Sequence, residues 1–198
     1  VNTILSAQSH FHVSLLHGIT GSGKTEVYLR LIAAMLMQDK QVLVLVPEIN
    51  LTPQLEAIFH NRFPCTNLIS LHSGLNDTER LQGWLQAQTG EANIVLGTRL
   101  AIFTPLPNLG LIIVDEEHDH SFKQQDGLRY SARDLAIFRS KQVNIPVILG
   151  SATPSLESYH SAITGRYRVI QLTSRAIKNA ALPTIQTIDT RIHKTFNG

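Results

Sequence analysis

Apolar runs alternate with helix-like segments along the chain. Most of these runs are continuous rather than alternating, which is typical of strands in a parallel sheet covered on both faces. They predict seven strands, at residues 13–17, 42–46, 67–71, 93–97, 109–114, 145–149 and 167–172. Regular alternation of strands and helices favours an α/β fold, a doubly wound and mainly parallel sheet with helices on both faces. In such sheets ligands bind at the carboxyl ends of the strands.

Capping residues mark where the helices between these strands begin. A threonine followed by proline places a cap before the first helical position, and a polar residue followed three positions later by an acidic one resembles a capping box. Four starts are predicted in this way, at Thr52-Pro53, Asn76 with Glu79, Ser131 with Asp134 (a weaker example) and Thr153-Pro154.

Two segments depart from the alternation. Residues 115–130 have no clear periodicity, are polar and carry aromatic side chains, so they are interpreted as a functional loop rather than a tight connection. The pattern weakens after Arg175. We therefore expect one globular domain at residues 1–175. Residues 176–198 are expected to be a linker and the start of a connection to a further structural unit.

A glycine-rich segment follows the first predicted strand and precedes a helical pattern. Gly18-Ile19-Thr20-Gly21-Ser22-Gly23-Lys24-Thr25 matches the P-loop pattern G-x-x-x-x-G-K-[ST]. Its backbone N–H groups and the helix N-terminus can surround a phosphate. Lys24 is expected to contact the β- and γ-phosphates, and the Thr25 hydroxyl to bind Mg²⁺. The candidate nucleotide-binding residues are Gly18, Thr20, Gly21, Ser22, Gly23, Lys24, Thr25 and Glu26. The alternative is a chance match in a glycine-rich turn.

A pair of acidic residues ends the strand predicted at 109–114. A P-loop enzyme needs one carboxylate to hold Mg²⁺ and another to deprotonate the attacking water. Asp115 is the candidate for the metal and Glu116 for the base. The alternative is an acidic strand end that only solvates a turn. The cluster from Glu116 to His120 could instead form a permanent metal site, although consecutive residues of one loop rarely converge on one ion.

A third motif, Gly150-Ser151-Ala152-Thr153-Pro154, follows the strand predicted at 145–149. Its hydroxyls would lie at a strand end near the Asp115 loop. It could equally be a tight turn with Thr153 as a helix cap, and Ser151 would still be free to hydrogen-bond the residues from Asp115 to His118.

Composition narrows the class of protein only slightly. The 198 residues suit one domain, and a net charge of +2 neither requires nor excludes a nucleic-acid partner. The single cysteine, Cys65, excludes an internal disulfide and a cysteine-based zinc site, and suits a reducing cytoplasm. No apolar run approaches the ~20 residues of a membrane helix, and no signal peptide is visible, so no membrane partner is expected. The first residue is not Met, which suggests an excised piece of a longer chain.

The motifs together carry a resemblance. GITGSGKT, DEEH and GSATP, in that order, resemble motifs I, II and III of superfamily 2 helicases. Four further segments make the match more specific: residues 45–54 (LVPEINLTPQ), 71–77 (LHSGLND), 97–103 (GTRLAIF) and 108–136, which ends in YSARDLA. From about Val1 to at least Arg175, the chain resembles the family of bacterial primosomal replication-restart helicases.

The resemblance implies the first RecA-like lobe of a two-lobed, cytoplasmic, ATP-driven 3′→5′ DNA helicase. ATP and Mg²⁺ are the implied cofactors. The implied partners are single-stranded or forked DNA, other primosome proteins and single-stranded-DNA-binding protein. The family's adenine-reading Gln would fall just before Val1, and Gln8 is not an obvious substitute. The second lobe with its arginine finger, the zinc-binding cysteines and the N-terminal DNA-binding domain are expected only in the rest of a longer protein. We therefore expect this chain alone to turn ATP over poorly.

The resemblance also assigns roles to individual residues. Three of them would couple the ATP site to DNA, namely His118, Ser151 and Thr153. The DNA-contact candidates are Pro47, His72, Ser73, Gly74, Thr98, Arg99, Phe122, Lys123, Arg129 and Tyr130. Exposed aromatic rings can stack on any base, and basic side chains bind phosphates. Leu128 departs from the family pattern, which often has an aromatic residue there.

Other interpretations remain for several of these residues. Thr98 could be a helix cap, Arg99 a solvated charge, and the rings of Phe122 and Tyr130 could pack under the loop. Trp84 lies in a predicted helix with Leu81 and Leu85, and this pattern favours packing in the core over contact with nucleic acid. The other function class is a P-loop switch or kinase-like phosphotransferase, although no arginine-rich lid or acceptor pocket is apparent. DNA-stimulated ATP turnover would discriminate between the two classes.

Overall fold

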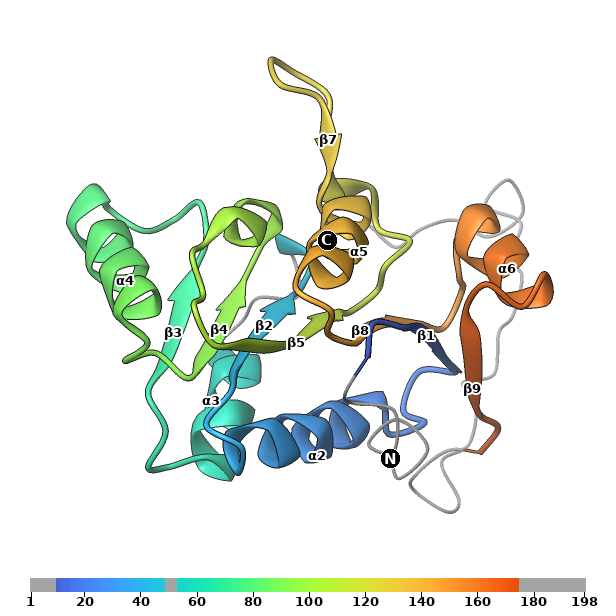
Figure 1. Cartoon of the computed structure of the whole chain (residues 1–198), viewed down its shortest axis with the longest axis horizontal. Helices are drawn as coiled ribbons and strands as arrows, with labels where there is room; N and C mark the ends of the chain where they lie inside the picture. Colours follow the sequence, from blue (N-terminus) through green and yellow to red (C-terminus); the bar gives the residue numbers. More distant parts are fainter. Residues whose placement is uncertain (1–9, 49–52, 175–198) are drawn as a thin grey trace, which may run out of the picture.

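In the part of the chain that the structure describes, seven parallel strands form a central sheet. The computed structural model describes residues 10–48 and 53–174. The strands run in the order β3-β4-β2-β5-β8-β1-β9, and every neighbouring pair is parallel (Figure 1). Their bounds are β1 (Val13–Gly18), β2 (Gln41–Leu45), β3 (Leu68–Leu71), β4 (Ile94–Gly97), β5 (Leu109–Val114), β8 (Val147–Ser151) and β9 (Arg168–Leu172). All seven predicted strands are present, so the predicted parallel α/β sheet is confirmed.

Helices cover both faces of this sheet (Figure 1). One face carries α2 (Lys24–Leu36) and α3 (Pro53–Arg62). The other carries α4 (Asp77–Thr89), the short 3-10 helix η2 (Arg99–Phe103), α5 (Ala132–Gln142) and α6 (Leu156–Ile163).

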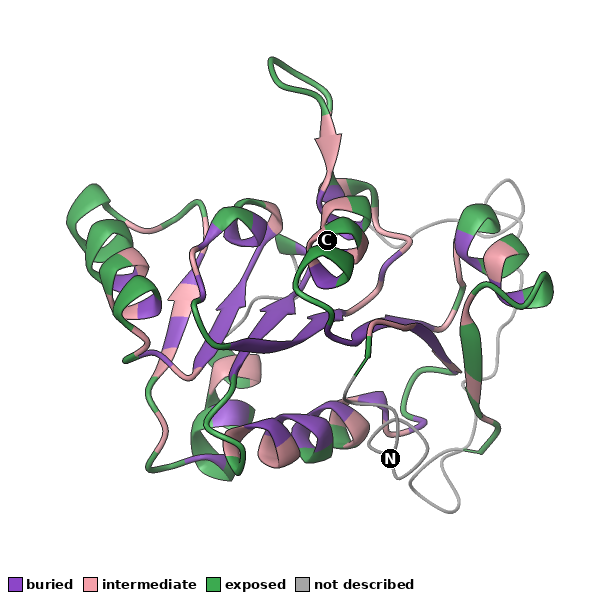
Figure 2. Ribbon diagram, viewed as in Figure 1, coloured by how far each residue is buried: buried purple, intermediate pink, exposed green. Residues whose placement is uncertain are grey.

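The sheet separates two hydrophobic cores. Along β2, Leu43 and Leu45 join the core under α4 and α5, whereas Val42 and Val44 join the core under α2 and α3. Successive side chains of a strand point to opposite faces, so a strand covered on both sides must be apolar throughout. Figure 2 shows the central strands buried along their length. This two-sided burial explains the continuous apolar runs of the sequence.

Between β5 and α5 in the sequence, a hairpin projects beyond the end of α5 and away from the sheet (Figure 1). After the short helix η3 (His120–Phe122), β6 (Lys123–Gln124) pairs antiparallel with β7 (Tyr130–Ser131). Residues 125–129 at its tip are exposed (Figure 2). The segment predicted as a long functional loop is therefore a short turn of helix followed by a projecting hairpin.

Two of the predicted helix caps are confirmed. The side chain of Asn76 accepts the Glu79 N–H at 2.9 Å, and the Glu79 carboxylate accepts the Asn76 N–H at 3.1 Å, which completes a capping box. The hydroxyl of Ser131 accepts the N–H of Asp134 at 3.3 Å. Helix α3 begins at Pro53, as predicted, while Thr52 lies outside the described residues.

The prediction that Thr153 caps the following helix was wrong. Helix α6 begins at Leu156, and its cap is Ser155, whose hydroxyl accepts the N–H of Ser158. The hydroxyl of Thr153 faces His118 instead. The linker predicted at 176–198 lies outside the described residues. Within the described ranges, no helix is long and apolar enough to cross a membrane.

Candidate nucleotide-binding site

The order of the strands brings the three sequence motifs to one edge of the sheet. Strand β8 lies between β5 and β1, with Leu149 beside Val114 and Gly150 beside Leu16. The carboxyl ends of parallel strands lie at the same edge of a sheet. The turn after β8 therefore lies between the P-loop, which follows β1, and residues 115–118, which follow β5 and are called the acidic loop below. Such an edge is where open α/β sheets bind ligands.

The P-loop has the backbone of a phosphate-binding turn. Gly21 and Gly23 adopt φ values of 77° and 94°, a left-handed conformation that favours glycine. Gly23 is the N-cap of α2 and has no side chain to occupy the free N–H groups of the first helical turn. The hydroxyl of Ser22 is buried and has no hydrogen-bond partner among the described residues. Ser22 does not face the cavity, and its N–H donates to the Ile19 carbonyl at 3.0 Å, so the donors left for an anion are the backbone N–H groups at the start of α2.

Lys24 connects the loop to the opposite wall of the site. It is buried, and its Nζ donates to the Gly18 carbonyl at 3.0 Å and lies 3.4 Å from Glu116 Oε1. A cavity of about 310 Å³ lies between these walls. It is lined by Ile19, Thr20, Gly21, Gly23, Lys24, Thr25, Asp115 and Glu116. Donors on one side and carboxylates on the other fit a nucleotide phosphate chain with a divalent cation.

Asp115 is held by a residue of helix α2. The Tyr28 hydroxyl donates to Asp115 Oδ1 at 2.8 Å. Burial raises the pKa of the Asp115 carboxyl and the nearby Glu116 adds to this effect, whereas the hydrogen bond from Tyr28 and the charge of Lys24 oppose it. Burial and the Asp115 charge raise the pKa of Tyr28 well above its usual range, so Tyr28 stays a hydrogen-bond donor. A divalent cation at this carboxylate would favour its ionised form.

Glu116 has a strained backbone, with a φ of 46°. A residue other than glycine rarely adopts this left-handed conformation, and it costs about 1–3 kcal/mol when it does. The loop is held on both sides of it, because the Asp115 N–H donates to Leu45 O at 2.9 Å and the Glu117 N–H to Gly150 O at 3.0 Å. Glu116 Oε2 also lies 3.7 Å from His118 Nδ1. The strained turn thus places the Glu116 carboxylate between Lys24 and His118.

The three predicted coupling residues lie together. His118 Nδ1 lies 2.8 Å from Ser151 Oγ, and its Nε2 lies 3.3 Å from Thr153 Oγ1. The Thr153 N–H donates to Ser151 Oγ at 3.0 Å. His118 thus connects the acidic loop with the turn after β8. In the described part of the chain, no three His, Cys, Asp or Glu side chains are arranged to hold a metal ion, so nothing supports a permanent site at 116–120.

The first group of predicted DNA contacts lies at the carboxyl ends of β2, β3 and β4. Ser73 and Gly74 are exposed, and the Gly74 N–H donates to His72 Nδ1 at 3.2 Å. Pro47 and Thr98 are buried. The Thr98 side chain forms no cap hydrogen bond with any described residue. Of these five residues, those of the His72–Gly74 turn are therefore the ones that a DNA strand could reach.

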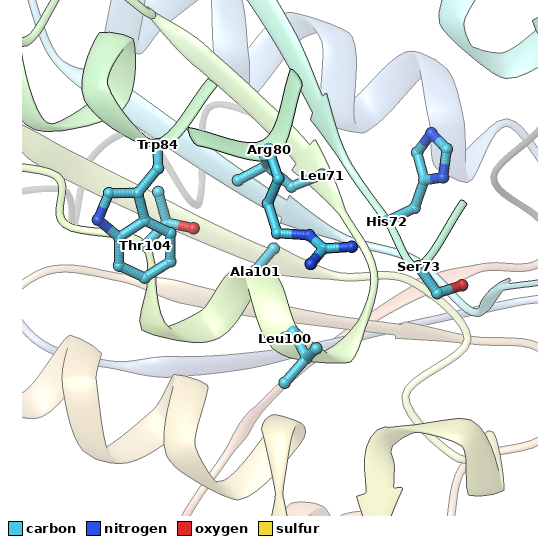
Figure 3. Close-up of a pocket in the computed structure, with 8 residues that line it drawn as sticks. All are labelled: Leu71, His72, Ser73, Arg80, Trp84, Leu100, Ala101 and Thr104. Atoms are coloured by element: carbon cyan, nitrogen blue, oxygen red, sulfur yellow. The ribbon is translucent and has the colours of Figure 1, made fainter. Parts of the chain in front are cut away.

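A small apolar pocket lies beside this turn (Figure 3). It is lined by Leu71, His72, Ser73, Arg80, Trp84, Leu100, Ala101 and Thr104. The interpretation of Trp84 and its neighbours as core was wrong, because Leu81 and Leu85 are 58% and 47% exposed and Trp84 is only half-buried. Gly83 and Ala87 pack α4 onto the sheet instead, since they are the buried residues of the helix.

Arg99 is neither a solvated charge nor a free phosphate ligand in this structure. Its Nη1 donates to the carbonyls of Ser121 and Lys123, at 3.1 and 3.2 Å. Arg99 therefore ties the segment after β4 to the base of the hairpin. This role was not predicted, because the contact joins residues distant in sequence.

The prediction that Phe122 stacks on DNA was wrong. Its side chain is 1% exposed and lies in the core, so it has no free face for a base. Tyr130 is half-buried and packs edge-on against Phe103, with ring centroids 5.1 Å apart. Lys123 and Arg129 are exposed. The hairpin thus offers basic side chains and an exposed Leu128 rather than an aromatic platform.

Two residues of the site were missed by sequence reasoning. Tyr28 contacts Asp115 from 87 positions away, and no local pattern could reveal this pairing. Glu117 is buried although it stands among polar residues. Glu117 is the third residue after β5 and belongs to the DEEH motif, but neither feature indicates that its side chain is buried.

Tyr28→Phe tests the contact with Asp115. Removing the hydroxyl leaves a partly buried carboxylate without its donor, which we expect to lower the free energy of unfolding by about 1–2 kcal/mol. Urea denaturation of the chain measures this quantity. The control is Tyr159→Phe, the same change at an exposed tyrosine, which should alter stability by less than about 0.5 kcal/mol. Equal stability of the two variants would contradict the assigned contact.

Sequence comparisons place the chain among helicases. Residues 1–162 match the DEAD/DEAH box helicase family. The chain is similar to replication restart protein PriA of Haemophilus influenzae, with 55% identity over 88% of this chain and 24% of that protein. It is 44% identical to PriA of Bacillus subtilis over 96% of this chain and 23% of the relative. The chain thus spans about a quarter of the length of these relatives.

Solved structures share the fold. The DEAD-box helicase Mss116, bound to single-stranded RNA and UDP-BeF, matches with a TM-score of 0.62 and 20% identity, over 87% of this chain and 38% of that one. RecG bound to a three-way DNA junction matches with a TM-score of 0.60 and 23% identity, over 84% and 21%. These neighbours support a RecA-like α/β fold. The chain belongs to the DEAD/DEAH box helicase family, and within it the chain is similar to the PriA replication restart proteins.

Proposed function

We propose that this chain is the ATP-binding lobe of a longer DNA helicase that acts in replication restart. The observation that carries the proposal is the cavity between the P-loop and the acidic loop, where Lys24 Nζ lies 3.4 Å from Glu116 Oε1. This geometry supplies phosphate donors and a carboxylate base to one space. The similarity to PriA proteins over most of the chain supports the choice of DNA as partner.

The residues that line the cavity have different roles in ATP hydrolysis. Lys24 and the N–H groups of Gly21, Gly23, Lys24 and Thr25, which line the cavity, bind the phosphates. Thr25 and Asp115 would hold Mg²⁺, which neutralises phosphate charge when it is bound. Glu116 orients the attacking water and accepts its proton. The contact with Lys24 keeps the Glu116 carboxylate directed into the cavity.

The same residues can connect hydrolysis with DNA. His118 contacts Ser151 and Thr153 on one side and lies near Glu116 on the other, so a change at the phosphates can reach the turn after β8. The DNA strand would lie along the His72–Gly74 turn and the basic hairpin residues Lys123 and Arg129. Movement is proposed to be 3′→5′. Other primosome proteins and single-stranded-DNA-binding protein are the proposed protein partners, by similarity to the family.

The experiment compares ATP turnover by the full-length protein and by the 198-residue chain, each with and without forked DNA. We expect DNA to stimulate the full-length protein. The chain alone should hydrolyse ATP about 10³–10⁵-fold more slowly than the DNA-stimulated full-length protein. The reason is that the arginine finger, which accelerates hydrolysis by this factor, would come from a second lobe. Robust DNA-stimulated turnover by the chain alone would refute the incomplete site. Duplexes with a single-stranded arm at the 3′ or the 5′ end test the direction of movement.

A further inference from the structure

Glu117 is the buried acid of the DEEH motif. Its side chain is almost wholly inaccessible, with the residue 2% exposed. Oε1 accepts the Ser155 N–H at 2.7 Å. Oε2 accepts the hydroxyls of Ser155 and Ser158, at 3.1 and 2.8 Å, and Nη1 of Arg133 at 3.2 Å. Both carboxylate oxygens are therefore hydrogen-bonded within the chain.

Such a carboxylate is expensive to bury and persists only when donors replace water. The Glu117 network meets this requirement with one cation and three neutral donors. Arg133 is itself shared, since its Nη1 also donates to Ser155 Oγ at 2.8 Å and its Nε to Asp134 Oδ1 at 2.8 Å. The members of the network are therefore interdependent, and displacing one leaves another buried group unpaired.

The network joins three segments that are distant in sequence. Glu117 lies between the base candidate Glu116 and the coupling residue His118. Ser155 caps α6, directly after the turn that carries Ser151 and Thr153. Arg133 is in the first turn of α5, two residues after Ser131, which ends the hairpin strand β7. The Glu117 carboxylate thus connects the acidic loop, the turn after β8 and the base of the hairpin.

We propose that Glu117 is a positioning residue that transmits DNA engagement at the hairpin to Glu116 and His118. This inference rests on the proposed function, because it needs DNA to act on the hairpin. A shift of the hairpin base moves Arg133, and a shift of the turn after β8 moves Ser155. Either shift displaces the Glu117 carboxylate and, through the backbone, its two neighbours. Glu117 does not line the nucleotide cavity, so its effect is on stimulation by DNA rather than on nucleotide binding.

Glu117→Gln in the full-length protein tests the proposal. The amide keeps the size of the side chain and one acceptor oxygen, but it removes the charge that pairs with Arg133. We expect the ratio of ATP turnover with forked DNA to turnover without it to fall by about 5-fold or more, a typical allosteric coupling. The dissociation constant for a fluorescent ATP analogue, measured without DNA, should stay within about 2-fold of wild type. The control is Glu91→Gln, the same change at an exposed glutamate, which should alter neither quantity.

Each outcome of this experiment decides between roles. An unchanged stimulation ratio overturns the transmitting role. So does a fall in DNA stimulation that is matched by an equal loss of nucleotide binding, because a merely structural network would weaken both. If the wild-type protein is not stimulated by DNA, the proposed function itself fails, which is distinguishable from failure of Glu117→Gln alone.

A second variant covers the case in which Glu117→Gln does not fold. Ser158→Ala removes one donor to Glu117 Oε2 and leaves the pair with Arg133 in place. We expect a smaller fall in DNA stimulation, about 2- to 3-fold, because only one neutral hydrogen bond is lost, with nucleotide binding again unchanged. A Ser158→Ala protein with the stimulation ratio of wild type would overturn the proposal.

Discussion

Glu116→Gln is expected to reduce ATP turnover by about 10²–10⁴-fold in the full-length protein, which is the usual contribution of a general base. The amide keeps the shape of the side chain but cannot accept a proton from water. Lys24 Nζ lies 3.4 Å from Glu116 Oε1, and an amide oxygen can still accept a hydrogen bond from it. Nucleotide affinity should therefore remain close to that of wild type.

Two measurements separate these effects. Steady-state phosphate release gives turnover, and binding of a fluorescent ATP analogue gives affinity. Glu91→Gln again supplies the control at an exposed position. Normal hydrolysis by the Glu116→Gln variant would mean that another group accepts the proton, and the role assigned to Glu116 would be wrong.

Lys24→Ala should act on binding itself. A hydrogen bond to a charged group contributes about 1.5–3 kcal/mol, so loss of the ammonium group is expected to weaken nucleotide binding by about 10- to 100-fold. The Gly18 carbonyl and the Glu116 carboxylate also lose their shared cation. Turnover at subsaturating ATP should fall at least in proportion.

The control for this variant is Lys141→Ala, which removes an exposed cation from α5. It should leave nucleotide affinity unchanged, which shows that any loss in Lys24→Ala is local. Isothermal titration with ATP and Mg²⁺ measures both variants. Wild-type affinity in Lys24→Ala would contradict the assignment of the P-loop as the phosphate site.

The fold was predictable because its information is local. A strand covered on both faces must be apolar along its length, and β2, β5 and β8 carry that requirement in consecutive residues. The capping box of Asn76 and Glu79 is likewise contained within one helical turn. The helix start near Thr153 was misplaced because Thr153-Pro154 and Ser155 offer two caps in succession, and the contacts of Ser155 with Glu117 decide between them.

The site was predictable where one segment carries a complete signal, and where strand ends share one edge of the sheet, as for the contact of Ser151 with His118. The P-loop and the Asp115-Glu116 pair are of the first kind. The burial of Phe122 and Glu117 and the tie from Arg99 to the hairpin depend on residues brought together by the fold. An aromatic ring and an acid in a polar loop look like surface residues, and only the packing of α5 and α6 against that loop shows otherwise.

The most direct test of the central claim is strand separation on forked DNA. The claim is that the cavity between Lys24 and Glu116 powers movement on DNA. We predict that the full-length protein separates the fork in the presence of ATP and Mg²⁺, and that the Glu116→Gln variant binds the same fork without separating it. Strand separation by the variant at the wild-type rate, or none by the wild-type protein, would contradict the claim.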